Sequence, residues 1–194
     1  DPEPHPVNKV ECSWDYKVYD GVKKGTGESG LKPPFIIKFP EESEHHLEIR
    51  CEDALGNEVV DEEIFIVDKT PPETTKSYDK PYLVYDGSEW ISTKTEISLS
   101  ATDTVGPHDS GVKATYWRNT VVDDEACRDD SICQENEGDG EFNLYEGPFK
   151  KEGESCHLIE YYSVDGVNKT ETVKKQCVFV DDTPPESDKT LGEN

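Results

Sequence analysis

Apolar residues occur along this chain in short runs separated by turn residues, and no long stretch follows the 3.6-residue period of an amphipathic helix. The clearest run is residues 95–101, where Ile97, Leu99 and Ala101 alternate with polar residues on one face of a strand. Further runs of β-branched and aromatic residues, bounded by Gly, Asn or Pro, are residues 46–49, 64–67, 78–84, 157–160 and 177–180. This pattern predicts an all-β protein built from short strands.

One stretch of sequence occurs twice, as Val-Asp-Lys-Thr-Pro-Pro-Glu at residues 67–73 and as Val-Asp-Asp-Thr-Pro-Pro-Glu at residues 180–186. Each copy is preceded, in the same order, by a Pro-Phe pair, a turn rich in Glu and Ser, a strand, a turn with Gly or Asn, and a last strand. Such an internal repeat predicts two tandem β-sandwich domains and an extended tail, at residues 1–69, 70–182 and 183–194.

The first predicted domain is short, and we expect it to lack its opening strand. Before Cys12 it offers only a Pro-rich arm, residues 1–10, in which three Pro within six residues do not fit a central strand. After the second repeat copy comes Ser-Asp-Lys-Thr-Leu, where Thr-Thr-Lys-Ser-Tyr follows the first. The tail therefore reads as the first strand of a further domain. We expect the following residues to act as a donor strand: Glu186, Ser187, Asp188, Lys189, Thr190 and Leu191.

Charge narrows the classes of partner. The chain has 44 acidic and 20 basic residues and a formal net charge of −24, which opposes binding to nucleic acid or to anionic lipid. It has no run of about 18 apolar residues, so we expect no membrane insertion. Divalent cations are the natural counter-charge, and Ca²⁺ is the cofactor we expect. The sequence starts at Asp1 and contains no Met, which favours a processed product or an excised fragment.

Six Cys favour disulfides and therefore an extracellular location, at a cell surface. Cys12 and Cys51 are the two Cys of the first domain and are expected to pair. Counting outward from the turn at residues 165–168 places Cys156 and Cys177 nearly opposite one another, which leaves Cys127 to pair with Cys133. A zinc site is the alternative, but the spacings lack the paired short knuckles of structural zinc folds.

The segment 123–141 holds nine carboxylates in nineteen residues. Such carboxylates repel one another unless they are solvated or share a cation. One interpretation is a calcium site, and the alternative is a solvated insertion between strands, since EF-hand spacing is absent. The candidate ligands are Asp123, Asp124, Asp129, Asp130, Asp139 and Glu141.

A second acidic group comes from loops that a sandwich gathers at one end and from the repeated segment. Oxygen ligands from separate loops at a domain junction suit a calcium ion that stiffens a string of sandwiches. The alternative is that each Asp bonds its own backbone in a turn. The members are Asp68, Asp103, Asp109, Asp165, Asp181 and Asp182.

Other chemistry in the sequence is sparse. Asn168-Lys169-Thr170 is a glycosylation sequon in a predicted hairpin turn. His45-His46 reads as the exposed beginning of a strand rather than a zinc pair. The three Trp are interpreted as packing residues, with a sugar-binding platform as the alternative. No nucleophile elbow, phosphate loop, zinc-protease motif or dinucleotide fingerprint is present, so we expect no enzyme and no organic cofactor.

Several segments together resemble the immunoglobulin-like repeats of bacterial and archaeal cell-surface proteins. They are Ser100-Ala101-Thr102-Asp103, Ser110-Gly111-Val112, Tyr116-Trp117-Arg118, Tyr145-Glu146-Gly147-Pro148-Phe149 and the run from Tyr161 to Asn168. The resemblance covers nearly all of residues 70–185. The first domain matches more weakly, through residues 51–57 and its tail, and lacks the Ser-Ala-Thr-Asp and Ser-Gly-Val segments. The resemblance implies immunoglobulin-like sandwiches strung together in large extracellular proteins, without catalysis.

Two hypotheses for function follow. In the first, the protein is the subunit of an extracellular filament that grows head to tail, its C-terminal strand inserting into the first domain of the next copy, with calcium as a stiffener. In the second, it is a calcium-stabilised stalk or adhesin module of a larger cell-surface protein.

Overall fold

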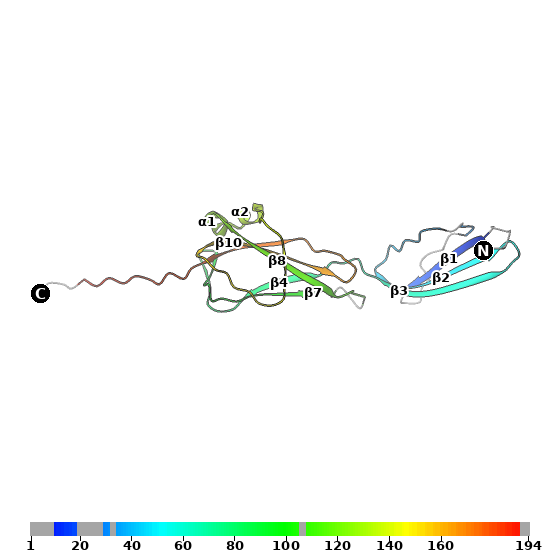
Figure 1. Ribbon diagram of the computed structural model, residues 1–194, viewed down its shortest axis with the longest axis horizontal. Helices are drawn as coiled ribbons and strands as arrows, with labels where there is room; N and C mark the ends of the chain where they lie inside the picture. Colours follow the sequence, from blue (N-terminus) through cyan, green and yellow to red (C-terminus); the bar gives the residue numbers. More distant parts are fainter. Residues whose placement is uncertain (1–9, 19–28, 32–33, 105–107, 191–194) are drawn as a thin grey trace. The chain divides into compact units, whose positions relative to one another are not determined.

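The computed structural model describes residues 10–18, 29–31, 34–104 and 108–190. The chain divides into two units: unit 1 holds residues 1–70 and 105–110, and unit 2 holds residues 71–104 and 111–194. Regular structure in both is almost entirely β (Figure 1), which confirms the predicted all-β class. The division falls within the first Thr-Pro-Pro segment.

Unit 1 is built on one antiparallel sheet with the strand order β1-β2-β3. Its strands are β1 (Val10–Val18), β2 (Ser43–Asp53) and β3 (Glu58–Val67). Alternate residues face the core, as in the cross-strand pairs Tyr16↔Leu47 and Trp14↔Ile49. The core consists of Tyr16, Val18 and Leu47 with Trp14, Ile37, Phe39, Ile49 and Phe65 packed against them.

His45 belongs to this core, which corrects the expectation that it is exposed. Its relative exposure is 0%. It stands opposite Val18 on β1 and Phe65 on β3, so its ring stacks on Phe65 with centroids 5.7 Å apart. Its Nδ1 lies 2.9 Å from the carbonyl oxygen of Ser43. His46, one residue on, points to the other face and is exposed, because side chains alternate along a strand.

Unit 2 has three layers (Figure 1). A six-stranded sheet with the order β5-β6-β11-β10-β8-β9 lies between the two-stranded sheet β4-β7 and two short helices. The strands are β4 (Glu73–Tyr78), β5 (Tyr82–Tyr85), β6 (Ser88–Ile91), β7 (Ile97–Thr102), β8 (Val112–Val122), β9 (Asn143–Leu144), β10 (Ser155–Asp165) and β11 (Lys174–Val180), and the helices are α1 (Asp124–Arg128) and α2 (Asp130–Glu135). Within the described chain, no helix is long and apolar enough to cross a lipid bilayer.

The central sheet has an apolar core on each face, because β10 sends alternate residues in opposite directions. Ile159 and Tyr161 face β4 and β7. Cys156 and Leu158 face the helices, where Ala126 packs against them. The predicted sandwich is thus formed by β4-β7 and the central sheet, and the acidic insertion adds a helical layer on the outer face.

The two units repeat the same hairpin. Asp53 Oδ1 accepts hydrogen bonds from the N–H groups of residues 55 and 57, at 2.8 and 2.9 Å. Asp165 Oδ1 accepts from residues 167 and 169 in the same way, at 2.9 and 2.7 Å. Gly56 and Asn168 take the left-handed conformation at equivalent positions, with φ of 84° and 67°. β2-β3 therefore corresponds to β10-β11, and His45, rather than His46, corresponds to His157.

The same correspondence shows which strands of unit 2 have a counterpart in unit 1. β1 matches β8, since Cys12 lies opposite Cys51 and Thr115 lies opposite the equivalent Ser163. The described residues of unit 1 thus match β8, β10 and β11, and hold no counterpart of β4, β5, β6 or β7. The predicted lack of an opening strand concerns residues 1–9, which lie outside the described residues, and it stays a prediction.

The disulfides hold the helical layer to the sheet. Cys12 pairs with Cys51 as predicted, but the other two predicted pairs are wrong: Cys127 bonds Cys156, and Cys133 bonds Cys177. The reason is the register in which β10 and β11 pair. Cys156 lies opposite Phe179, and Cys177 lies opposite Leu158, so the two Cys are diagonal neighbours on one face. Diagonal neighbours stand about 7–8 Å apart, which is beyond ordinary disulfide geometry.

Candidate functional site

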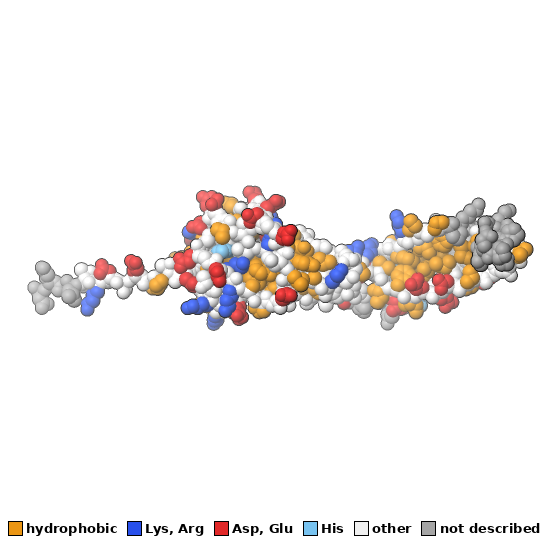
Figure 2. All heavy atoms as spheres, in the orientation of Figure 1, with side chains coloured by type: hydrophobic (Ala, Val, Ile, Leu, Met, Phe, Trp, Pro, Cys, Tyr) orange, Lys and Arg blue, Asp and Glu red, His pale blue; other side chains and the backbone are white. Residues whose placement is uncertain are grey.

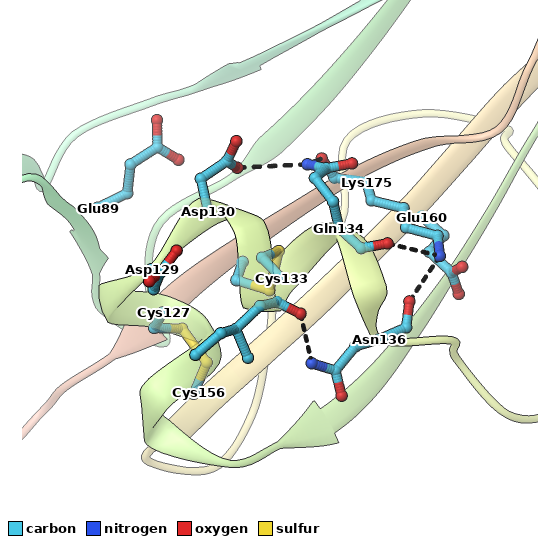
Figure 3. The surroundings of a disulfide bond; sticks show 12 residues. Glu89, Cys127, Asp129, Asp130, Cys133, Gln134, Asn136, Cys156, Glu160 and Lys175 are labelled. Carbon is cyan, nitrogen blue, oxygen red and sulfur yellow. Dashed lines mark hydrogen bonds between the residues drawn. A yellow bond between two sulfur atoms is a disulfide. The ribbon is translucent and has the colours of Figure 1, made fainter.

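The acidic segment 123–141 forms local structure in which its carboxylates have separate roles. Asp129 is the N-cap of α2, and its Oδ1 accepts from the N–H and hydroxyl of Ser131 at 2.9 and 2.6 Å. These bonds hold the pKa of Asp129 below its usual value. Asp130 Oδ1 accepts from the Gln134 side chain, as drawn in Figure 3. Acidic side chains gather on the outer surface of this part of unit 2 (Figure 2).

These carboxylates do not converge on one point. Asp123, Asp124, Asp129, Asp130, Asp139 and Glu141 are all exposed. Among the described residues, no three of them bring ligand atoms within 4.8 Å of one another. The segment is fastened instead by its disulfides and by Lys175, whose Nζ donates to the carbonyl of Asn136 at 2.6 Å (Figure 3). A calcium site in this segment therefore stays a prediction, because its carboxylates are not gathered around one point among the described residues.

Beneath the acidic segment lies a buried ion pair that sequence reasoning missed. Glu160 is 1% exposed, and its Oε2 accepts from Arg118 Nε at 2.5 Å and from the N–H of Gly138 at 3.0 Å. The hydrogen bond to Glu160 raises the pKa of Arg118 above its usual value. Nothing in the sequence singles out this pair, because Arg118 and Glu160 come from β8 and β10, and the third residue, Gly138, comes from the connection after α2.

The second acidic group contains one close pair within unit 2. Asp103 directly follows β7, and Asp165 ends β10 directly after a register shift in its pairing with β8. Their relative exposures are 5% and 0%, and a carboxylate oxygen of one lies within 4.8 Å of an oxygen of the other. Asp165 Oδ2 is buried and has no hydrogen-bond partner among the described residues. Two such carboxylates repel when both are ionised, and a shared cation removes that cost.

The remaining members of the group serve the repeated segment or its surroundings. Asp68 in unit 1 is buried, and its two oxygens accept from the N–H groups of Thr70 and Ser110, at 3.1 and 2.9 Å. Asp181 accepts from the N–H of Thr183 at 2.9 Å. Asp182 accepts from residue 93, and Asp109 is exposed. For Asp68 and Asp181, the interpretation that Asp bonds its own turn describes the local geometry.

The two Asp-x-Thr-Pro-Pro copies are anchored alike. Thr70 Oγ1 donates to Glu42 Oε2 at 2.7 Å, and Thr183 Oγ1 donates to Glu154 Oε2 at 2.8 Å. The N–H of the preceding residue donates to the same carboxylate in each copy, at 3.2 and 3.0 Å. Glu42 and Glu154 were not predicted as partners, although both stand in the Glu-Ser turns that the repeat contains. Each copy is therefore fastened by hydrogen bonds to a Glu that precedes it in the chain.

Beyond this anchor the tail makes no regular structure. Residues 183–190 are exposed and form neither strand nor helix, and Leu191 lies outside the described residues. The matching residues after the first repeat copy form β4, where Thr74 is 1% exposed and pairs with Ala101 on β7. Lys76 on β4 is also enclosed, and burial lowers its pKa to about 7. Residues 186–190 of the expected donor strand thus have no partner strand among the described residues.

The other predicted features take ordinary positions. Asn168 is exposed in its turn, and its Oδ1 accepts from Lys113 Nζ at 2.7 Å, so glycosylation stays a prediction. All three Trp contribute to packing, as the simpler interpretation expected: Trp14 in the core of unit 1, Trp90 stacked on Phe179, and Trp117 stacked on Phe149.

No protein-family model matches the chain, and no curated protein sequence matches it. Among solved structures, it is similar to fibronectin(III)-like modules of Clostridium thermocellum CbhA, with 13% sequence identity, a TM-score of 0.38, and coverage of 93% of this chain and 81% of that chain. This similarity is too low to support an argument about function. The β-sandwich follows from the strands of unit 2 themselves, and the family suggested by the sequence stays a prediction.

Proposed function

We propose that the protein is a structural subunit of an extracellular filament, in which the tail of one copy adds as a strand to unit 1 of the next. The observation that carries the proposal is that residues 186–191 resemble β4, with Glu and Lys at equivalent positions, and that the described part of this segment is exposed and unpaired. A strand of this kind gains main-chain hydrogen bonds when it joins a sheet edge. The three disulfides support an oxidising, extracellular location.

Unit 1 offers an edge for such a strand. Its residues 35–39 are assigned to no strand, and half-buried Phe35, Ile37 and Phe39 alternate with exposed residues, as in a strand with one face on the core. Among the described residues, no backbone hydrogen bond joins this segment to another strand. The corresponding segment of unit 2 is paired, since Phe149 and Ile97 of β7 exchange hydrogen bonds at 2.8 and 3.0 Å. In the filament, the incoming tail strand pairs with this segment of unit 1, as β7 pairs with the corresponding segment of unit 2.

A second candidate is favoured by a different observation. The described residues of unit 1 lack counterparts of four strands, and one tail strand fills only one of those places. The tail also matches β4 rather than β7. In this alternative the protein is a stalk or adhesin module of a larger cell-surface protein, and the tail begins another immunoglobulin-like unit.

Removal of residues 186–194 tests the filament. We expect the complete chain to form assemblies that lengthen with concentration, seen by electron microscopy and sedimentation, and the shortened chain to stay monomeric. Ser187 and Thr190 provide matched point variants. By analogy with β4, Ser187 faces the acceptor core and Thr190 faces solvent. Ser187→Asp is therefore expected to block assembly, whereas Thr190→Asp leaves it intact. Monomers from both the complete and the shortened chains reject the filament and leave the second candidate.

For the metal we propose calcium at Asp103 and Asp165 of unit 2, where it stiffens the end of the sandwich. The support is the buried oxygen of Asp165 and its nearby second carboxylate. Oxygen-only ligands of this charge suit Ca²⁺.

We expect calcium to raise the melting temperature of the wild-type protein relative to chelator, since a ligand at a hundred times its dissociation constant adds about 3 kcal/mol. Asp165→Asn keeps the turn acceptor Oδ1 and removes the charge. It is expected to abolish the calcium response and to raise stability in chelator, because it ends the repulsion with Asp103.

Asp53→Asn is the matched control, because Asp53 makes the same turn but its Oδ2 already accepts from the Asn57 side chain at 2.7 Å. This variant is expected to retain the wild-type calcium response. Equal responses in the Asp165 and Asp53 variants place calcium elsewhere, and melting curves that coincide with and without chelator in the wild type reject calcium altogether.

A further inference from the structure

The outer face of the sheet in unit 1, which is turned away from its core, carries like charges side by side. Glu48 on β2 stands directly opposite Glu62 on β3, and Asp15 on β1 stands opposite Glu48 on its other side. Arg50 Nη2 donates to Glu48 at 3.2 Å. Glu62 is exposed, and no ion pair with a described residue holds it. Like charges directly opposite one another destabilise a sheet, so this arrangement has a cost in the free protein.

Unit 2 has alternating charges at the same place. Since β2 corresponds to β10 and β3 to β11, Glu48 matches Glu160 and Glu62 matches Lys175, and both pairs stand directly opposite one another. Arg118 on β8 lies on the other side of Glu160 and completes the row. The charge of the β11 residue is therefore inverted in β3 of unit 1.

In unit 2, the basic residue of β11 holds a covering layer. Lys175 Nζ donates to the carbonyl oxygens of residues 134 and 136, at 3.2 and 2.6 Å, at the end of α2. On the same face of β11, Cys177 and Phe179 are 8% and 5% exposed, because α1 and α2 pack on them. This face of the sheet is thus covered by a helical segment that accepts hydrogen bonds from a lysine.

The matching apolar residues of unit 1 are exposed. Ile64 and Ile66 on β3 take the positions of Cys177 and Phe179, and they are 63% and 52% exposed. Val60, on the same face, is 41% exposed. Aliphatic residues gathered on one face of a sheet favour contact with a partner.

A hollow joins the carboxylates to this aliphatic stripe. It has a volume of about 280 Å³, and Glu48, Glu62 and Ile64 line it. Lys17 and His46 line it as well. A Lys or Arg side chain that enters this hollow gains charge-assisted hydrogen bonds with Glu62 and relieves its repulsion with Glu48.

We propose that the outer face of unit 1 binds a segment of another protein that presents Lys or Arg side chains between aliphatic residues. A basic side chain of the partner lies between Glu48 and Glu62, and its aliphatic residues cover Ile64 and Ile66. The segment takes for unit 1 the place that the helical layer takes in unit 2, with the basic group on the partner instead of on the strand. The net charge of −24 opposes a second copy of this chain in that role. The contact does not involve the tail, so it goes beyond both proposed functions.

Binding of labelled peptides to the complete chain, followed by fluorescence anisotropy, tests the proposal. The probe is an amphipathic peptide of Ala, Ile and Lys. One matched peptide has Glu in place of Lys, and another has Ser in place of Ile. The measurements are made near physiological salt, where attraction between distant exposed charges is largely screened. We expect the Lys- and Ile-containing peptide to bind and the two matched peptides to bind far more weakly.

Glu62→Lys gives unit 1 the charge order of unit 2. It is expected to weaken binding of the probe about tenfold or more, and to raise the melting temperature of unit 1 because it ends the repulsion with Glu48. Ile64→Ser is expected to weaken binding to a similar degree, and it keeps the fold because Ile64 is exposed. Glu152→Lys is the matched control, since it makes the same change of charge at an exposed position of unit 2, and it is expected to leave the dissociation constant within about twofold.

Three outcomes overturn the proposal. The first is a probe that does not bind the wild-type chain. The second is an equal loss of binding in the Glu62 and Glu152 variants, which shows attraction to the net charge of the chain and not to this face. The third is equal binding of the Ser-containing peptide, which shows that the aliphatic residues take no part. A melting temperature that is not lowered in the Glu62 variant separates a lost contact from a lost fold.

Discussion

Replacement of Gly138 by alanine is expected to lower the free energy of unfolding of unit 2 by about 3–5 kcal/mol, the cost typical of breaking a buried ion pair. A Cβ at this position overlaps Glu160 Oε2 and stands 2.9 Å from Thr120 Oγ1, both closer than real contacts allow, and it lies 3.0 Å from Arg118 Nε. Glu160 cannot move aside cheaply, because it is buried and held by Arg118 and by the Gly138 N–H itself. The new methyl group therefore separates the pair or displaces the chain after α2.

Chemical denaturation followed by circular dichroism measures the effect. Gly140→Ala is the control, since Gly140 has a φ of 83° but no atom within 4 Å of the added Cβ. Backbone strain alone then costs about 1–2 kcal/mol. Adding Glu160→Asp to Gly138→Ala shortens the carboxylate and is expected to recover part of the loss. A Gly138 variant no less stable than the Gly140 variant contradicts the described packing.

Removal of the Cys133–Cys177 disulfide by the double change to Ser is expected to cost roughly 4 kcal/mol, from the chain entropy of the loop it closes. The two Cys are 44 residues apart, and the bond ties α2 to β11. The apolar layer beneath the helices depends on it, since Ala126, Ile132 and Phe179 pack around the sulfur atoms. We expect the loss to appear as a lower melting temperature of unit 2.

The disulfide pairing can also be tested directly. Proteolysis without reduction, followed by mass spectrometry, is expected to yield peptides linked as Cys127–Cys156 and Cys133–Cys177. A linked Cys127–Cys133 peptide contradicts this arrangement. Removing Cys12 and Cys51 instead is the matched control, because that bond lies in unit 1 and its loss is expected to leave the unfolding of unit 2 unchanged.

Local patterns predicted several elements well. The alternation at Ile97 and Leu99 corresponds to β7, in which both side chains are buried. The Asp-initiated turn at Asp165 is the observed β10–β11 turn, because its side chain bonds the backbone within four residues. The helices of the acidic segment were not predicted, since each is too short for a periodic pattern and is held by disulfides.

For the candidate sites too, the sequence predicted some features and the tertiary structure decided others. The sequence singled out twelve carboxylates as calcium ligands, and only a fold decides which of them lose contact with water. Asp103 and Asp165 are buried beside one another because β7 and β10 end at the same place, whereas Asp129 caps a helix in solvent. The buried state of His45 likewise depends on its cross-strand neighbours and not on the residue itself.

By itself, the sequence determined the all-β class, the repeated Asp-x-Thr-Pro-Pro segment and the resemblance of the tail to β4, because these depend on residue types at short and regular spacings. Only the tertiary structure decided the disulfide partners of Cys127 and Cys133, the burial of Glu160 against Gly138, and the contact of Ser110 with Asp68. Each of these joins residues at least 22 positions apart through strand register or loop placement. Register depends on how whole faces pack, and no short pattern encodes it.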